Sequence, residues 1–171
     1  MTTGKVSITD CVFTSDGECA IDIHGDTCDP TFERCRVEAG KADGVRFRDN
    51  AGGMFEDNEI SYTSGFGIEV TAGVSAVFVK NKVHHCSGGG LAVRGVTETI
   101  FDDCVFHSNG GDATVLLDEG ASTTMRGCMI RDGRGHGVIS KTGSSGILED
   151  NDIHTNRKSG ILLLVESALT V

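Results

Sequence analysis

One series of seven residues recurs along the chain at an almost constant spacing. Its members are separated by 24, 23, 23, 23, 24 and 23 residues, and we call them the anchors: Cys11, Cys35, Asn58, Asn81, Cys104, Cys128 and Asn151. The residue three positions before each anchor and the residue two positions after it are apolar in every unit. Such a period indicates a solenoid, because repeats of this length bury their apolar side only against their neighbours.

Each unit also carries an apolar pair beyond the anchor, such as Ile68 and Val70, with a small residue such as Gly67 before it. Alternation of apolar and polar residues is typical of short strands with one buried face. A glycine before the strand permits a bend that a Cβ atom would obstruct. In the sixth unit Val138 is followed by Ser140, a polar residue at a position that is apolar elsewhere.

These units predict an all-β fold, a right-handed parallel β-helix of about seven coils with about 23 residues each. Helical repeats would need apolar residues at a spacing of 3.6, whereas segments such as 67–70 and 77–79 alternate or are β-branched. We expect residues 1–171 to form one domain that is a fragment of, or a module from, a longer protein.

The anchors predict a polar ladder inside the solenoid. An asparagine at the same place in successive coils can bond to its copies and to turn backbone. The four cysteine anchors predict buried, reduced thiols that act as small apolar side chains. Disulfides joining Cys11 to Cys35 and Cys104 to Cys128 are the alternative, since adjacent coils bring Cα atoms near bonding range, but parallel Cβ vectors disfavour them.

The position directly before the anchor alternates in charge through the first units. It is occupied in turn by Asp10, Arg34, Asp57, Lys80, Asp103, Gly127 and Asp150. Alternating signs on neighbouring coils predict a salt-bridge ladder. A calcium-dependent lyase would instead need clustered aspartates and a catalytic arginine on one face, and the cations interrupt such a cluster.

Two segments carry a resemblance to a known family. The strings GILEDNDIH at 146–154 and FEDNEI at 55–60 are similar to the parallel β-helix repeats of F-box-only-11-type proteins. Those repeats belong to the pectin-lyase-like superfamily of carbohydrate-binding and sugar-hydrolase (CASH) repeats. The resemblance covers nearly the whole chain and implies the fold rather than a site. It further implies a part that recognises a substrate protein, although the F-box itself is not among these residues.

Many β-helices of that superfamily cleave acidic polysaccharides, and two fragments resemble a polygalacturonase. They are the pair Asp102-Asp103 and His136 between two glycines. In that family three carboxylates and a histidine share one face. Here the acidic pair and the histidine fall at different places in the repeat, so they should not converge. No catalytic residue is therefore predicted, and the alternative catalytic set is Asp57, Asp103 and His136.

A further row of polar residues stands three positions past the later anchors and should face outward: His84, His107, Arg131 and His154. We interpret it as a solvated polar row or as a partner-binding stripe that responds to pH. A metal site would need converging ligands. Only Cys86 could complete one with the first two histidines, so neither a metal nor a cofactor is predicted.

Composition restricts the partners and the compartment. A net charge of −10 argues against nucleic acid and anionic membranes, which require a basic face. No apolar run is long enough to span a membrane. Seven cysteines without a CxxC pair, and a start at Met1 to Lys5 unlike a signal peptide, predict an intracellular, cytoplasmic protein.

The leading functional prediction is a non-catalytic protein-recognition or scaffold module. The alternative is a carbohydrate-binding or polysaccharide-processing β-helix, against which stands the scarcity of aromatic platforms, since the chain has no Trp and one tyrosine, Tyr62. The last unit contains the segment 161–165, which is apolar on both faces. We expect Leu162 and Leu164 to point outward there and to mediate self-association through the last coil.

Overall fold

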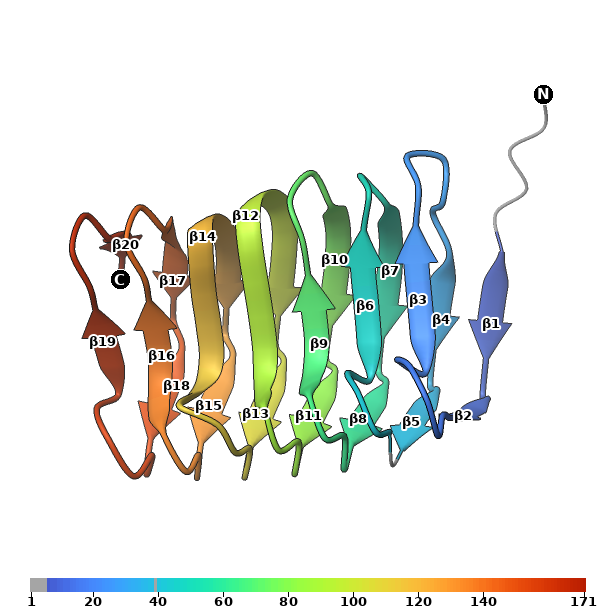
Figure 1. Ribbon diagram of the computed structural model, residues 1–171, viewed down its shortest axis with the longest axis horizontal. Helices are drawn as coiled ribbons and strands as arrows, with labels where there is room; N and C mark the ends of the chain where they lie inside the picture. Colours follow the sequence, from blue (N-terminus) through green and yellow to red (C-terminus); the bar gives the residue numbers. More distant parts are fainter. Residues whose placement is uncertain (1–5, 39) are drawn as a thin grey trace.

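The computed structural model describes residues 6–38 and 40–171, so that Met1 to Lys5 lie outside it. Within that part the regular structure consists of twenty short or bent strands, wound into a solenoid whose coils follow one another along its axis (Figure 1). No helix in the described ranges is long and apolar enough to cross a membrane. The predicted parallel β-helix of seven coils is confirmed.

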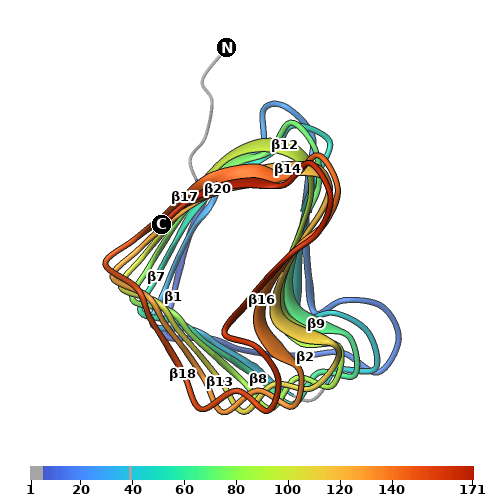
Figure 2. The same cartoon turned by 90° about the vertical axis from the view of Figure 1, so that its left-hand side faces the viewer.

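The strands form three faces that surround the core, as the view along the solenoid axis shows (Figure 2). The first face contains β3 (Ile21–His24), β6 (Val45–Arg48), β9 (Phe66–Val70), the first halves of β12 (Gly89–Asp102) and β14 (Ala113–Arg126), β16 (His136–Ser140) and β19 (Ile161–Leu163). The second contains β1 (Ser7–Thr9), β4 (Thr31–Glu33), β7 (Gly52–Glu56), β10 (Ser75–Val79), the second halves of β12 and β14, β17 (Ser145–Glu149) and β20 (Ala168–Thr170). The third contains β2 (Val12–Thr14), β5 (Arg36–Glu38), β8 (Glu59–Ser61), β11 (Lys82–His84), β13 (Val105–His107), β15 (Met129–Arg131) and β18 (Asp152–His154).

The core is built from rows of identical positions in successive coils. All strand pairs are parallel, so each inward residue lies on its counterpart one coil away, as Phe55 does on Phe78 and Phe78 on Phe101. The rings of Phe78 and Phe101 stack with centroids 4.4 Å apart. The pairs predicted on the first face are buried in the middle coils, and Ser140 takes its place in that row between Leu117 and Leu163.

The asparagine anchors form the hydrogen bonds that the repeat predicts. Asn81 Oδ1 accepts from the backbone N–H and the Nδ2 group of Asn58, each at 3.0 Å, and Asn81 Nδ2 donates to Phe55 O at 2.8 Å. Asn58 in turn accepts from Cys35 N at 2.8 Å. The side chains therefore satisfy buried turn amides that strand pairing leaves free.

The cysteine anchors are free thiols, and burial holds for three of the four. Cys35, Cys104 and Cys128 are buried, and their thiols donate to backbone carbonyls. Cys11 is exposed, so the expectation that it is buried is wrong. It belongs to the first described coil, which has a described neighbour on one side only.

The position before the anchor is governed by backbone conformation rather than charge. All seven residues there have a positive φ, between 52° and 59°. Aspartate and glycine tolerate this left-handed conformation better than most residues. Within the described chain, the only ion pair joining two residues of this series is Arg34–Asp10, at 2.9 Å. The predicted salt-bridge ladder is therefore wrong beyond that pair.

Candidate functional site

The predicted row of His84, His107, Arg131 and His154 lies along the third face, one residue per coil, in continuous register. The members differ in exposure, however. His84 is only 7% exposed, whereas His154 is exposed. The expectation of a uniformly solvated row is wrong at His84, because neighbouring side chains cover its ring.

Those neighbours come from the turn that follows each strand of the third face. Four positions past the anchor the backbone again takes a positive φ, which turns Tyr62, His85 and Ser108 outward at the same corner of successive coils. Asp132 and Thr155 continue this series. The turn therefore aligns side chains from different coils beside the histidine row, and we call Glu59, Tyr62, His84, His85 and His107 the histidine corner.

A chain of hydrogen bonds runs through the histidine corner. Glu59 Oε1 lies 2.8 Å from His84 Nε2, and His84 Nδ1 lies 2.8 Å from His85 Nδ1. A neutral His84 that donates from Nε2 to the carboxylate accepts at Nδ1 from the N–H of His85. The hydrogen bond from His84 is the main reason that the pKa of Glu59 is lowered, with Lys82 and Arg36 adding to the effect.

Ring stacking organises the same residues. Tyr62 and His85 stack with centroids 5.1 Å apart and ring planes 20° apart, and Tyr62 is 60% exposed. His84 and His107 stack at 4.8 Å and 12°. The corner therefore presents an exposed aromatic surface supported by a second, more buried pair of rings.

A shallow hollow of about 160 Å³ adjoins this surface, lined by Tyr62, His85, Cys86, Ser87, Ser108, Gly110 and Arg134. Arg134 is exposed and forms no ion pair within the described part of the chain. Its guanidinium is thus available to an anion, and the serine hydroxyls can donate or accept hydrogen bonds.

His107 is the least satisfied group of the corner. Its Nδ1 lies 3.1 Å from Ser108 Oγ, while its Nε2 is buried without a partner among the described residues. Burial, with further contributions from His84, Arg131 and Lys82, lowers the pKa of His107 to about 4. The ring is therefore neutral at pH 7, and its Nε2 makes no hydrogen bond to a described residue.

The other candidate residues do not join this site. Asp57 and Asp103 lie at the corner between the second and third faces, whereas His136 begins β16 on the first face, where its Nδ1 accepts from Ser159 N at 3.2 Å. Cys86 points into the core and is 1% exposed. Among the described residues no group of three His, Cys, Asp or Glu side chains is placed to hold a metal ion.

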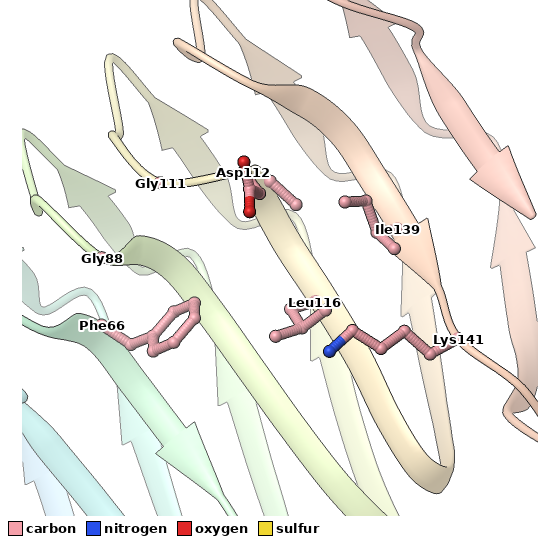
Figure 3. Close-up of a pocket in the computed structure, with 8 residues that line it drawn as sticks. Phe66, Gly88, Gly111, Asp112, Leu116, Ile139 and Lys141 are labelled. Carbon is pink, nitrogen blue, oxygen red and sulfur yellow. The ribbon is translucent and has the colours of Figure 1, made fainter. Parts of the chain in front are cut away.

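A second surface feature lies on the first face, and we call it the apolar groove (Figure 3). It encloses about 310 Å³ and is lined by Phe66, Gly88, Gly111, Asp112, Ala113, Leu116, Ile139 and Lys141. Leu162 pairs with Ile139 and is half-buried, so it extends the outer row of the groove. Leu164 is exposed, as expected, at 42%.

Both surfaces depend on residues that the sequence analysis did not connect. Tyr62 and His85 share one position of the repeat, four past their anchors, and that periodicity was a usable signal. Glu59 reaches His84 across one coil, which only the strand register reveals. A second asparagine ladder five positions past the anchors was also missed, in which Asn109 Oδ1 accepts from Cys86 N at 3.0 Å.

Family comparison agrees with this geometry. The family described as right handed beta helix region matches residues 2–114 and 64–171. The chain belongs to the right-handed β-helix family. Within this β-helix the comparison supports the repeat itself, and the finer likeness to F-box-only-11-type proteins stays a prediction.

One solved structure shares the fold of this right-handed β-helix over most of its length. The A-module of the mannuronan C-5 epimerase AlgE4 from Azotobacter vinelandii is similar with a TM-score of 0.70 and 18% identity, over 91% of this chain. The chain spans 46% of that module. QnrB1, a plasmid-mediated fluoroquinolone resistance protein, aligns with a TM-score of 0.21 and 9% identity over 94% of this chain and 92% of its own, a likeness too weak to indicate a common fold. No curated protein matches the sequence.

Proposed function

We propose that this right-handed β-helix binds an acidic carbohydrate at the histidine corner. The observation that carries the proposal is the exposed Tyr62–His85 stack beside a hollow bordered by Arg134, which forms no ion pair with a described residue. A sugar ring presents C–H groups that pack on an aromatic face, and a guanidinium forms paired hydrogen bonds with a carboxylate. Serine hydroxyls in the hollow suit the hydroxyl groups of a sugar.

The local charge at the corner differs from that of the whole chain. The net charge of −10 acts over the entire surface and is screened beyond roughly 8 Å at physiological ionic strength. Arg134 borders the hollow itself, whereas the nearby Lys82 and Arg131 are paired with Glu59 and Asp132. A short acidic oligosaccharide fits this arrangement better than a long polyanion. The name of the AlgE4 neighbour, a mannuronan epimerase, supports the same ligand class.

The proposal concerns binding alone. If the protein also turned over its ligand, the hydrogen-bonded residues Glu59, His84 and His85 would be the groups suited to the chemistry. A carboxylate that fixes one histidine, which in turn contacts a second, is an arrangement suited to moving a proton. Incubation with uronate oligosaccharides, followed by NMR of the sugar protons and measurement of unsaturated and reducing ends, separates binding from turnover.

Calorimetric titration with uronate and matched neutral oligosaccharides tests the proposal. We expect binding of the uronate series only, weakened about tenfold by Tyr62→Ala or by Arg134→Ala. Arg126→Ala, on the second face, is the matched control and should leave affinity unchanged. Absence of binding by every uronate, or binding indifferent to Tyr62→Ala, would overturn the proposal.

The apolar groove favours a second candidate function, protein recognition. Its lining is largely apolar, and it lies on the opposite side of β12 and β14 from the core residues Leu91 and Leu117. Apolar hollows with a charged border are typical of protein interfaces. A protein partner that binds the wild type and Tyr62→Ala with equal affinity, but does not bind Leu116→Lys, would show that the groove is the recognition site.

A further inference from the structure

The outer row of the first face changes character along the solenoid. In strand register it contains Asp22, Arg46, Glu69, Ala92, Leu116, Ile139 and Leu162. The first three are charged, and Arg46 bonds to Glu69 at 3.0 Å. The last four are apolar although they point away from the core. Leu116 and Leu162 are half-buried there, whereas neighbouring side chains cover Ala92 and Ile139. This half of the face is therefore suited to contact with another apolar surface.

The apolar row is bordered by opposite charges at its two sides. Asp112 directly precedes β14; its side chain is 92% exposed, and its Oδ1 lies 3.5 Å from Lys158 Nζ. Lys141 directly follows β16, with its side chain 44% exposed and its Nζ 2.8 Å from Asp118. Since β14 and β16 are parallel, Asp112 lies at the start of the strands and Lys141 at their end, with Leu116 and Ile139 between them (Figure 3).

A twofold axis parallel to the solenoid axis makes this face complementary to itself. Two copies facing each other across such an axis have antiparallel strands, so the start of each strand faces the end of the other. Leu116, which is half-buried, then meets its own counterpart, beside the nearly covered Ile139. Asp112 of each copy faces Lys141 of the other, which lies one coil away along the axis.

We propose that the apolar groove is the interface of a homodimer in which two copies pack side by side with parallel solenoid axes. The inference rests on the second candidate function, protein recognition, and it identifies the recognised protein as a second copy of this chain. An apolar strip between opposite charges fits a copy of itself without any additional partner. The interface uses the first face, whereas the sequence predicted self-association through the last coil.

Analytical ultracentrifugation of the wild-type chain over a concentration series tests the inference. We expect a reversible monomer–dimer equilibrium that Leu116→Lys shifts toward monomer by more than tenfold, because a buried unpaired ammonium opposes association. Val77→Lys is the matched control, since Val77 is an outward, exposed residue of the second face, and it should dimerise as wild type does. Circular dichroism confirms that both variants fold.

A charge exchange tests the proposed orientation. Asp112→Lys alone should weaken the dimer about threefold to fivefold, since exposed ion pairs contribute modestly. Adding Lys141→Glu in the same chain should restore association, because both contacts are then reversed together.

Three results would overturn the inference. They are a wild-type chain that stays monomeric at high concentration, a dimer unaffected by Leu116→Lys, and a dimer broken by Leu164→Glu but not by Leu116→Lys, which would assign the interface to the last coil. A monomeric chain that still bound a different protein through Leu116 would overturn the homodimer while leaving protein recognition intact.

Discussion

Glu59 and His84 come from neighbouring coils, and the carboxylate Oε1 lies 2.8 Å from the imidazole Nε2. The contact exists because β8 and β11 pair in register, which puts Glu59 beside Lys82 and within reach of the buried His84. It fixes the tautomer of His84 and thereby the direction of the bond to His85. One register-dependent contact thus organises the whole histidine corner.

Glu59→Gln should lower the free energy of unfolding at neutral pH by less than about 1 kcal/mol, since the carboxylate is partly exposed. The folded pKa of Glu59 lies below its usual 4.5. Its contribution is therefore complete above pH 4.5 and is lost as the pH falls through the lowered value. Urea unfolding of both proteins from pH 7 to pH 3 should show the two curves converge at the acid end. A constant difference would contradict the assignment.

The pKa of His107, lowered to about 4 from 6.5, predicts a loss of stability at mildly acid pH. Between these values the unfolded chain binds a proton that the folded chain does not, so stability falls as the pH decreases from 6.5 to 4 and levels off below. Partial exposure limits the effect to about 1–2 kcal/mol. His107→Phe keeps a ring on His84 without titrating and should remove this component, as measured by urea unfolding against pH. NMR titration of His107 near its usual pKa would contradict the prediction.

Asn81→Leu should destabilise the fold by about 1–3 kcal/mol, because it removes an acceptor and a donor from buried partners. Asn58 N and Phe55 O would each lose their hydrogen bond to the side chain. Asn151→Leu is the comparison, since Asn151 is half-buried, and it should cost less. Thermal and urea unfolding measure both, and equal costs would show that burial does not set the value.

The repeat predicted the fold because each coil packs only on its neighbours, so the spacing along the sequence determines which residues stack. Anchor spacing sets the number of coils, and the apolar positions on either side, such as Phe78 and Val83, set which residues stack. Contacts within the site could not be predicted in the same way. The stacking of Tyr62 on His85 depends on a left-handed backbone conformation at Tyr62. Tyrosine rarely adopts that conformation, so nothing in the sequence indicated it.

The charge series before the anchors shows the converse error. Asp57 and Lys80 suggested pairing, yet both occupy a corner whose positive φ directs their side chains according to the turn. The recurrence of aspartate at this position therefore reflects the positive φ that the turn requires, and not an interaction between side chains. The exposure of Cys11 has an equally physical origin, because the same anchor is buried only where coils lie on both sides.

Thiol labelling should divide the cysteines into classes. Cys11 should react with a thiol reagent in the native state at a rate near that of the unfolded chain, whereas Cys35, Cys86, Cys104 and Cys128 should be protected. Burial also raises the pKa of the Cys86 thiol, which reduces its thiolate fraction. Mass spectrometry of modified peptides over time measures the rates. Rapid modification of Cys104 in the folded protein would contradict the packing of the ladder.

Ser140 occupies an apolar row of the core, between Leu117 in the preceding coil and Leu163 in the next. Its hydroxyl oxygen is buried without a hydrogen-bond partner among the described residues, so the folded state bears a desolvation cost that no bond offsets. Ser140→Val should therefore raise the free energy of unfolding by about 1–2 kcal/mol, from loss of that cost and from added apolar contact. Ser140→Ala is the matched control, because it removes the hydroxyl without adding a methyl group and should give a smaller gain. Destabilisation by Ala as well as by Val, measured by urea unfolding, would show that the hydroxyl has a partner after all, such as a bound water, whereas destabilisation by Val alone would show that the row has no room for the second methyl group.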